Sequence, residues 1–416
     1  MKRAILALTL ACATTGLMTR VSAQAPAVTV YEGARVIVGD GRAPIENAVF
    51  VVTDNRITQV GTAATVKAPA GAQHVNLAGK TVMPAIIDTH THLSTTRDML
   101  ADDLAKRAYY GIAATMSLGT DEGDLPYQMR ETTTTGLARF FTAGRGITSP
   151  EPGRTTVPYW ITTPAEARKA VQELAAKHVD IVKIWVDDRN GMYKKLSPEL
   201  YTAVIKEAHA HGLRVIAHIF ALEDAKGLLK AGVDAFAHGV RDKDVDDEFM
   251  ALLKRHKNLV LGPNMPDRGV VADIAWLRDS LPAAEYQRLQ AANTNRPDAQ
   301  AAWAIQGRNL AKMSAAGVTI VVGTDGNTPY APHQEMADMV AAGMTPAQVL
   351  VAATRNGARF LRMTDSGTIA AGQVADFLVL DANPLDDIAN TRRIASVYLR
   401  GVQVNRTAYW LPGTAR

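Results

Sequence analysis

The chain has 416 residues, which is long enough for one large barrel domain or for two domains of ordinary size. Its hydrophobic content of 47% and charged content of 21% exclude an intrinsically disordered protein. The formal charge of +4 is small and depends largely on the N-terminal segment, so it indicates no nucleic-acid or membrane partner.

Residues 1–23 have the pattern of a secretory signal peptide. Lys2 and Arg3 precede an uncharged, mostly apolar stretch from Ala4 to Met18, and residues 21–23 form a small-residue cleavage site. A transmembrane anchor is the alternative, but the apolar stretch is short and contains several Thr residues. Cleavage would remove three basic residues and no acid, lowering the formal charge from +4 to +1, and would remove the only cysteine, Cys12. We therefore expect a soluble mature protein, secreted or periplasmic, without disulfides or thiolate ligands.

The segment from about residue 27 to 81 has the pattern of an antiparallel sheet. Short β-branched runs at 35–38 and 48–52 are separated by turn residues. The C-terminal stretch is similar, with runs at 377–380 and 396–399. Two β-rich ends around a different middle predict one small domain assembled from both termini.

The middle of the chain alternates helices with short apolar strands. Ser197-Pro198 opens a helix with a cap and a proline in the first turn, and Thr163-Pro164 and Thr345-Pro346 do the same. Such alternation indicates βαβ units and a parallel sheet. Eight candidate strands favour a closed (β/α)8 barrel over an open sheet. They lie around residues 82–88, 112–117, 140–142, 181–185, 214–217, 235–237, 259–261 and 318–322.

His90-Thr91-His92, directly after the first of these strands, is the strongest chemical signal in the chain. Side chains of a strand alternate, so both imidazoles lie on one face. Two neutral imidazoles that converge from one strand end are half of a metal site. Because the mature chain has no cysteine, the other ligands must be histidine, carboxylate or a less usual group.

Four further polar residues stand within or just after predicted strands: Lys183 in the fourth, His218 and His238 at the ends of the fifth and sixth, and Asp325 past the eighth. In a (β/α)8 barrel, chemistry lies at the C-terminal ends of the strands. Each residue has a structural alternative: a core histidine, a loop turn for Asp325, or a snorkelling side chain for Lys183. Their shared position, together with the two histidines of the first strand, favours the functional interpretation.

These segments resemble the metal-dependent amidohydrolase superfamily, in the branch of imidazolonepropionase-like and Xaa-Pro dipeptidase-like enzymes. The resemblance implies an α/β fold with a distorted (β/α)8 TIM barrel over residues 83–365. It also implies a small β-sandwich domain formed by residues 24–82 and 366–416. The matching segments are Met83–His92, Val182-Lys183-Ile184, Ile216-Ala217-His218, Ala237-His238-Gly239, Gly323-Thr324-Asp325, Ser366–Ile369 and Gly372–Asp376.

The resemblance implies a site for two divalent metal ions, bridged by Lys183 after its carboxylation by carbon dioxide. Burial of a lysine lowers its pKa and makes that reaction feasible. Zinc suits nitrogen and oxygen ligands best, and Mn, Co or Ni are alternatives. One ion would be held by His90, His92 and Asp325, and the other by His218 and His238.

The expected reaction is hydrolysis of an amide bond, in dipeptides or N-acyl amino acids. A metal pair lowers the pKa of a bridging water, so that hydroxide exists near neutral pH. Asp325 would take the proton from the attacking hydroxide and pass it to the leaving nitrogen. No covalent intermediate is needed.

The loops that would recognise the substrate depart from the peptidase-like pattern. Many relatives carry a histidine in a Gly-rich loop after the third strand, whereas residues 144–154 contain none. After His218 the chain continues with apolar residues, Ile219 and Phe220 among them. This predicts an apolar wall that favours substrates with an apolar or aromatic group.

Three polar residues are candidates for substrate contacts. Arg154 or Arg145 could pair with a substrate carboxylate, and His333 lies in the loop after Asp325. We expect a small-molecule amide or peptide as the partner, and the sequence leaves a homo-oligomer open.

Two other functions stay open. A cyclic-amide hydrolase or a deaminase of the same superfamily often uses one metal and lacks the lysine of the fourth strand, so Lys183 counts against it. A non-catalytic binding protein on the same scaffold would be expected to have lost a ligand, and none is missing from the sequence.

Overall fold

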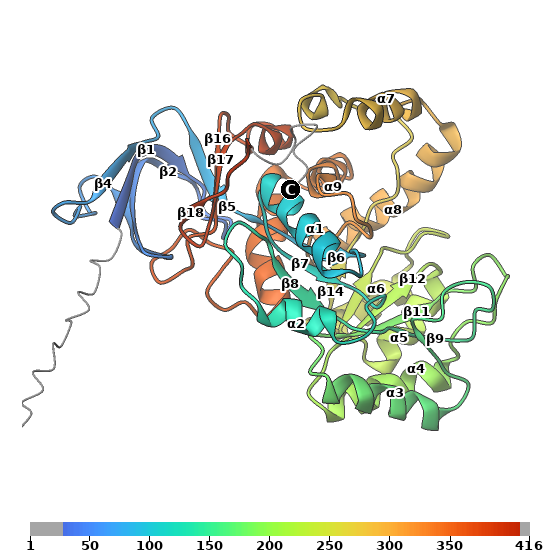
Figure 1. Ribbon diagram of the computed structural model, residues 1–416. Coiled ribbons are helices and arrows are strands. Elements are labelled where there is room, and N and C mark those ends of the chain that lie inside the picture. The colour runs from blue at the N-terminus through green and yellow to red at the C-terminus, as the bar shows by residue number, and fades with distance from the viewer. Residues whose placement is uncertain (1–27, 408–416) are drawn as a thin grey trace, which may run out of the picture.

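A mixed sheet of eight strands is built from both ends of the described chain, residues 28–407, in this computed structural model. The predicted signal peptide lies outside the described residues. The strand order is β18-β17-β16-β5-β1-β2-β3, with β4 paired to β1, so strands from the two ends lie side by side (Figure 1). The strands are β1 (Val28–Val36), β2 (Ile45–Thr53), β3 (Arg56–Thr62), β4 (Gln73–Asn76), β5 (Thr81–Pro84), β16 (Phe377–Leu380), β17 (Ile394–Leu399) and β18 (Val402–Gln403).

This sheet folds over on itself around a cluster of aromatic rings. Tyr31 on β1 and Tyr398 on β17 stand three strand positions apart, which would separate them by about 14 Å in a flat sheet. Their ring centroids are only 5.4 Å apart, Phe50 stacks on Tyr31, and Phe377 stacks on Tyr398. The pairing of β1 with β2 shifts register between Glu32 and Val36, and irregularities of this kind, such as β-bulges, increase the twist of a sheet. The small domain that the sequence predicts from both termini is, in the structure, this one strongly bent sheet.

Parallel strands alternating with helices form the rest of the molecule. They fall into a three-stranded sheet, β6-β7-β8, and a seven-stranded sheet, β10-β9-β11-β12-β13-β14-β15. Backbone hydrogen bonds join the two sheets at both edges, from Asp180 to Thr142 at 3.0 Å and from Thr89 to Val322 at 2.9 Å. The strands are β6 (Ile86–Thr91), β7 (Ile112–Ser117), β8 (Arg139–Thr142), β9 (Ile147–Thr148), β10 (Tyr159–Trp160), β11 (Val182–Val186), β12 (Val215–Ile219), β13 (Ala235–Ala237), β14 (Val260–Gly262) and β15 (Thr319–Ile320).

The first predicted strand, at residues 82–88, is two strands in the structure. The amide of Ala85 donates to Asp376 in the bent sheet, whereas the amide of Ile86 donates to Gly111 beside β7. The chain therefore changes sheets within one residue, directly after Pro84. A continuous apolar run hides this switch, because both segments are fully buried.

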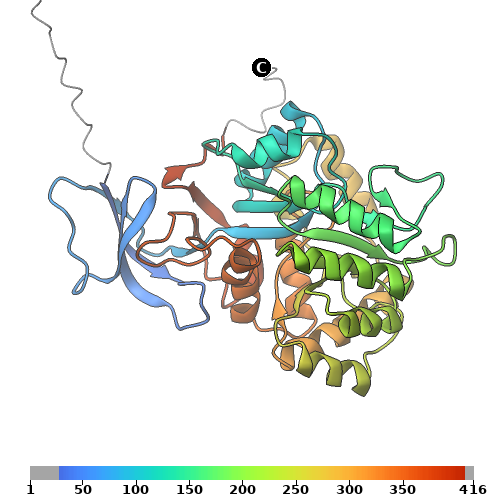
Figure 2. The ribbon, with the colours of Figure 1, turned by 90° about the horizontal axis from the view of Figure 1, so that it is seen from below.

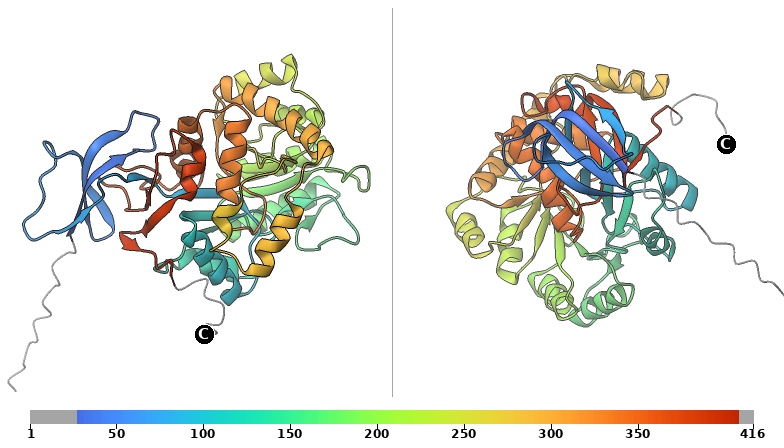
Figure 3. Two further views of the ribbon diagram at one scale, coloured as in Figure 1. Left: turned by 90° about the horizontal axis from the view of Figure 1, so that it is seen from above. Right: turned by 90° about the vertical axis from the view of Figure 1, so that its left-hand side faces the viewer.

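Figure 2 and Figure 3 both show that helices lie on the outer side of the parallel strands. The predicted starts at Thr163 and Thr345 are confirmed as capping boxes, and the Ser197 side chain accepts from the Leu200 amide. Within residues 28–407, no helix combines the length and apolar character needed to cross a bilayer. The helices are α1 (Arg97–Tyr109), α2 (Leu125–Glu131), α3 (Pro164–Ala176), α4 (Pro198–Ala210), α5 (Leu222–Ala231), α6 (Asp247–Arg255), α7 (Ala283–Ala292), α8 (Pro297–Ala315), α9 (Ala331–Ala341), α10 (Pro346–Val351) and α11 (Gly357–Phe360).

Candidate metal centre

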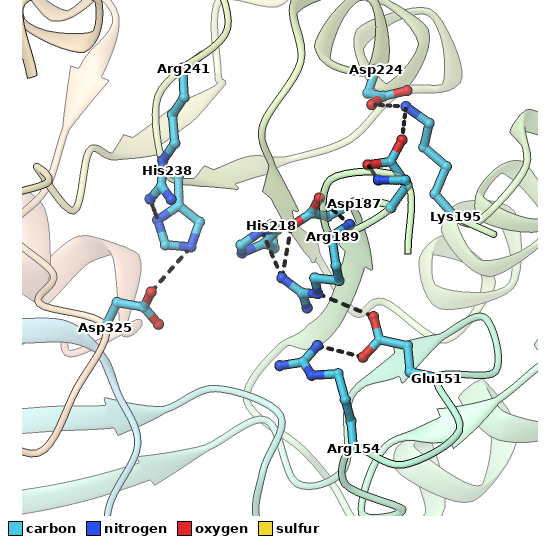
Figure 4. Close-up of polar contacts among 12 residues, drawn as sticks. Glu151, Arg154, Asp187, Arg189, Lys195, His218, Asp224, His238, Arg241 and Asp325 are labelled. Carbon is cyan, nitrogen blue, oxygen red and sulfur yellow. Dashed lines mark hydrogen bonds and ion pairs between the residues drawn. The ribbon is translucent and has the colours of Figure 1, made fainter. Parts of the chain in front are cut away.

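Asp325 lies among three of the predicted histidines. Its Oδ1 is 3.1 Å from Nε2 of His90 and 3.0 Å from Nε2 of His92, and its Oδ2 is 3.5 Å from Nε2 of His238. The ring of His218 packs on that of His238, with centroids 4.4 Å apart. Ligand atoms of His90, His238 and Asp325 all lie within 4.8 Å of one another, which is close enough to share a cation. Figure 4 shows how His218, His238 and Asp325 face one another.

The backbone around these residues is held in unusual conformations. Asp325 has a φ of 54° and His238 a φ of 121°, in the region that favours glycine. Each costs of order 1–3 kcal/mol and persists only where the surroundings enforce it. The amide of Asp325 donates to the His90 carbonyl at 2.8 Å, and the amide of His238 donates to the Gly262 carbonyl at 2.8 Å. A Cβ at Gly323 would lie 2.9 Å from Cβ of His90, so this close approach requires glycine.

Burial keeps the buried histidines neutral, which is the form that binds a metal ion. It lowers the pKa of His90 and of His218 to about 4, and the pKa of His238 falls well below its usual value for the same reason. Burial alone would raise the pKa of Asp325, but the positive charge that His90 takes up on protonation, together with hydrogen bonds from His90 and His92, holds the pKa of Asp325 well below its usual range. At neutral pH the site thus offers neutral imidazoles and an ionised carboxylate, the forms that bind cations.

Lys183 on β11 is completely buried, and its Nζ has no hydrogen-bond partner among the described residues. Its Nζ lies 5.3 Å from the ring centre of Trp185. Burial lowers the pKa of Lys183 to about 7, so much of the amine is neutral near neutral pH. A buried amine without a partner is costly unless another group joins it. The absence of a partner for Nζ is consistent with a lysine that becomes carboxylated, because the resulting carbamate is an anion that could bind a metal ion.

The second ring nitrogen of three histidines is occupied by residues that the sequence interpretation missed. These contacts orient the rings and leave the other nitrogen to bind a cation. Two of these residues share the position of the predicted metal ligands, since Asp187 follows β11 and Asn264 follows β14. That position could have identified them in the sequence. The contacts are His90 Nδ1 to Asn264 Oδ1 at 2.9 Å, His92 Nδ1 to Thr120 Oγ1 at 3.0 Å, and His218 Nε2 to Asp187 Oδ2 at 3.1 Å.

Side chains of alternating charge link Asp187 through Arg189 and Glu151 to Arg154 (Figure 4). Nη1 of Arg189 lies 2.7 Å from Asp187 and 3.4 Å from Nε2 of His218. Nε of Arg189 lies 3.2 Å from Glu151, whose other oxygen accepts from Arg154 at 2.6 Å. Arg154 is therefore near this side of the site, but its charge is already paired with Glu151.

Arg145, the other predicted partner for a substrate carboxylate, is occupied as well. Its Nε donates to the Val157 carbonyl, and its guanidinium stacks 3.9 Å above the ring centre of Tyr159. Arg241, which the sequence interpretation missed, lies three residues after His238. Its Nη2 contacts Nδ1 of His238.

The structure corrects the prediction for His333. This residue lies in the first turn of α9, is 1% exposed, and uses both ring nitrogens internally. Nδ1 contacts Oγ1 of Thr391 at 3.1 Å, and Nε2 contacts the Tyr110 carbonyl at 2.9 Å. A histidine with no free nitrogen fixes local packing and does not contact a substrate.

The predicted apolar wall after His218 is smaller than expected. Ile219 is 1% exposed and belongs to the main core, because alternation along β12 turns it away from the face of His218. Leu222 is buried in the same core. Phe220 is 38% exposed, so it alone of these three can offer an apolar surface.

A cavity of about 820 Å³ reaches Thr324, the residue before Asp325. It lies between the segment that follows β14, including Met265 and Arg268, and helix α9. Two acids on α9 line it, Glu335 and Asp338, and burial raises the pKa of Asp338 to about 7. The volume is in the range of small-molecule pockets.

Histidines and a carboxylate gathered at the ends of parallel strands form a group that could hold a metal ion. The family model described as "Amidohydrolase family" matches residues 81–404, so the chain belongs to that family. Its members hydrolyse carbon–nitrogen bonds such as amides and generally use divalent metals. The predicted superfamily and enzyme class are thus confirmed.

Individual relatives cover nearly the whole chain. An imidazolonepropionase of Deinococcus radiodurans is 29% identical over 386 residues, which are 86% of this chain and 92% of that protein. An ochratoxinase of Aspergillus niger is 25% identical and covers 87% of this chain and 82% of its own. The solved structure of a provisionally named prolidase from Bifidobacterium longum superposes with a TM-score of 0.74, at 28% identity, over 94% of this chain and 96% of that one. Such neighbours imply a TIM-barrel-like fold with an added sheet domain.

Proposed function

We propose that the chain is an exported, binuclear metal-dependent amidohydrolase that cleaves amide bonds of dipeptides or N-acyl amino acids carrying an apolar group. The observation that carries this proposal is the convergence of His90, His92 and His238 on one carboxylate, Asp325, beside a buried lysine without a partner. Export rests on the signal-peptide pattern of residues 1–23.

The fold that carries the site is a distorted (β/α)8 barrel in this proposal. The hydrogen bonds that join β8 to the start of β11, and β6 to the end of β15, support a closed ring of strands. Closure brings all the polar strand ends to one face, where this fold places its chemistry.

The residues present fit two divalent cations, most simply zinc. His90, His92 and Asp325 would hold the first, and His218 and His238 the second, with carboxylated Lys183 between them. Bound there, the ions would supply polarisation of the scissile carbonyl and a hydroxide nucleophile at neutral pH. The donor set contains only nitrogen and oxygen atoms, which also suits Mn, Co or Ni.

Side chains of the protein would transfer the proton and orient the histidine rings. Asp325 is ionised, so its carboxylate can take a proton at Oδ1 or Oδ2 and deliver it to the leaving nitrogen. Asn264 and Thr120 keep the rings of His90 and His92 in place through their Nδ1 atoms.

A cyclic-amide hydrolase is the second candidate. The likeness to an imidazolonepropionase favours it, whereas the buried Lys183 favours the binuclear enzyme. A non-catalytic scaffold is disfavoured, because none of the six ligand positions carries a residue unable to bind metal.

The two catalytic candidates separate in one experiment. Purified mature protein is incubated with a panel of N-acyl amino acids, dipeptides, lactams and esters, and kcat/KM is measured for each. We expect open-chain amides with apolar groups to be the best substrates. Exclusive turnover of lactams would favour the cyclic-amide hydrolase, and no turnover of any amide would contradict both.

A further inference from the structure

Arg241 is a partly buried guanidinium that has no carboxylate within ion-pair distance among the described residues. Its Nε is buried without a hydrogen-bond partner, and its Nη2 faces the ring of His238. The nearby arginines differ, because Arg189 and Arg154 both have carboxylate partners. Buried charges in proteins are normally paired. The carboxylates of Asp325, Asp187 and Glu335 act on Arg241 electrostatically, but none of them lies within ion-pair distance. An arginine beside the strand ends without a direct partner points to an anionic ligand.

The contact between Arg241 and His238 leaves a place for an acceptor. In the present arrangement Nη2 of Arg241 donates to Nδ1 of His238, and Nε2 of His238 faces Asp325 at 3.5 Å. When His238 gives its Nε2 lone pair to a cation, its Nδ1 must carry the ring hydrogen. Nδ1 of His238 and Nη2 of Arg241 are then both hydrogen-bond donors that face each other. Because arginine cannot accept a hydrogen bond, the two groups need a shared acceptor. A carboxylate oxygen can accept from both.

The spacing suits a carboxylate close to the scissile bond. Arg241 and Asp325 contact opposite nitrogens of the His238 ring, so one imidazole ring separates the guanidinium from the proton-transferring carboxylate. In an N-acyl amino acid or a dipeptide, a single Cα separates the scissile nitrogen from the α-carboxylate. Both groups of such a substrate could therefore be held at once.

We propose that Arg241 anchors the free α-carboxylate of the leaving amino acid, so that the enzyme prefers N-acyl amino acids and dipeptides to neutral amides. This inference rests on the proposed amide hydrolysis and specifies its substrate class. It replaces Arg154 and Arg145 as the carboxylate partner, since the structure engages both of those internally.

The test uses two substrates that differ only in the carboxylate, N-benzoyl-L-phenylalanine and N-benzoyl-2-phenylethylamine. We expect the wild type to prefer the acid, chiefly through KM. Arg241→Met should lower kcat/KM for the acid by roughly ten- to a hundredfold more than for the neutral amide, the strength of charge-assisted hydrogen bonds. Arg241→Lys should keep part of the preference. The matched control Arg154→Met should change both substrates alike.

A binding measurement keeps the inference separate from catalysis. Calorimetry with L-phenylalanine and 2-phenylethylamine, on protein of measured metal content, should show that the wild type binds the amino acid more tightly and that Arg241→Met loses this difference. An equal fall in kcat/KM for both substrates in Arg241→Met would contradict the role of Arg241 as carboxylate anchor. Equal affinity of the wild type for L-phenylalanine and 2-phenylethylamine would contradict it as well. If no amide is cleaved at all, the proposed function fails, and the binding data alone decide on Arg241.

Discussion

Among single residues of the site, Asp325 contacts three imidazoles, whereas Nζ of Lys183 has no hydrogen-bond partner in the described part of the chain. The pKa of Asp325 lies well below its usual range, because His90 and His92 outweigh the effect of burial. An ionised carboxylate at this position can bind a cation and accept a proton, and these two roles predict different consequences of substitution.

Asp325→Asn should preserve the fold and lower kcat by roughly 10²–10⁴-fold, the usual contribution of a general acid–base group. The amide keeps an oxygen for the metal but cannot accept the proton. Circular dichroism and metal analysis serve as controls for folding and loading. Retention of most of the activity by a loaded variant would remove Asp325 from its proposed role.

Phe220 is the exposed apolar residue next to β12, and it should set part of the substrate preference. Burying an aromatic group is worth about 1.5–3 kcal/mol, or roughly ten- to a hundredfold in kcat/KM. Phe220→Ala should flatten the preference for bulky acyl groups without changing metal content. Val402→Ala, an exposed apolar residue on β18, is the matched control. If glycine-rich dipeptides are the better substrates of the wild type, the interpretation of Phe220 is wrong.

At the scale of elements, the segment after β14 supports the site from outside. Asn264 is 4% exposed, has a φ of 44°, and contacts Nδ1 of His90. The next amide, that of Met265, donates to Glu335 on α9 at 2.9 Å. Helix α9 therefore holds the segment that orients a proposed metal ligand.

Asn264→Ala should weaken metal binding by about 10–100-fold, as loss of the partner of a ligand histidine commonly does. The removal of bound metal by a chelator, followed at several chelator concentrations, measures this. Asn55→Ala, at an exposed position between β2 and β3, should leave metal retention unchanged. Unchanged retention in Asn264→Ala as well would show that the contact with His90 is incidental.

Asp338 on α9 makes stability depend on pH. Burial raises its pKa to about 7, although Arg268 opposes the shift, whereas an unfolded Asp titrates near pH 4. The folded state therefore binds the proton more tightly, and the stability it contributes at low pH is lost as pH rises through about 7.

Asp338→Asn cannot ionise, so it should lose less stability than the wild type between about pH 5 and pH 8. Urea unfolding at both pH values measures the difference. Asp279→Asn, at an exposed position, is the matched control and should follow the wild type. An equal loss in Asp338→Asn and the wild type would mean that Asp338 is already ionised at pH 5.

At the scale of the whole molecule, the sequence predicts the features that local patterns encode. The eight strands were placed within a few residues because each is a short apolar run between turns or helices. The histidines and Asp325 were found because they end those runs. The switch between sheets at Pro84 was missed, since both segments are apolar and buried.

Other misses have a different physical cause. Asn264 and Asp187 stand just past strand ends, but the sequence does not show which histidine each of them contacts. Arg241 has no such signal, because its contact with His238 depends on how the loop after β13 folds. His333 shows the reverse error. It stands near Asp325 in sequence, but the helix that begins at Ala331 carries it into the core beside Tyr110.

If Lys183 completes a site for two metal ions, the number of metal ions bound per chain must depend on it. Protein purified without chelators is analysed by mass spectrometry for metal per chain, in the wild type and in Lys183→Ala. We predict about two equivalents in the wild type, loss of metal and activity in the variant, and partial rescue of both by a short carboxylic acid. One equivalent in fully active wild type, or two equivalents and full turnover in Lys183→Ala, would contradict the account.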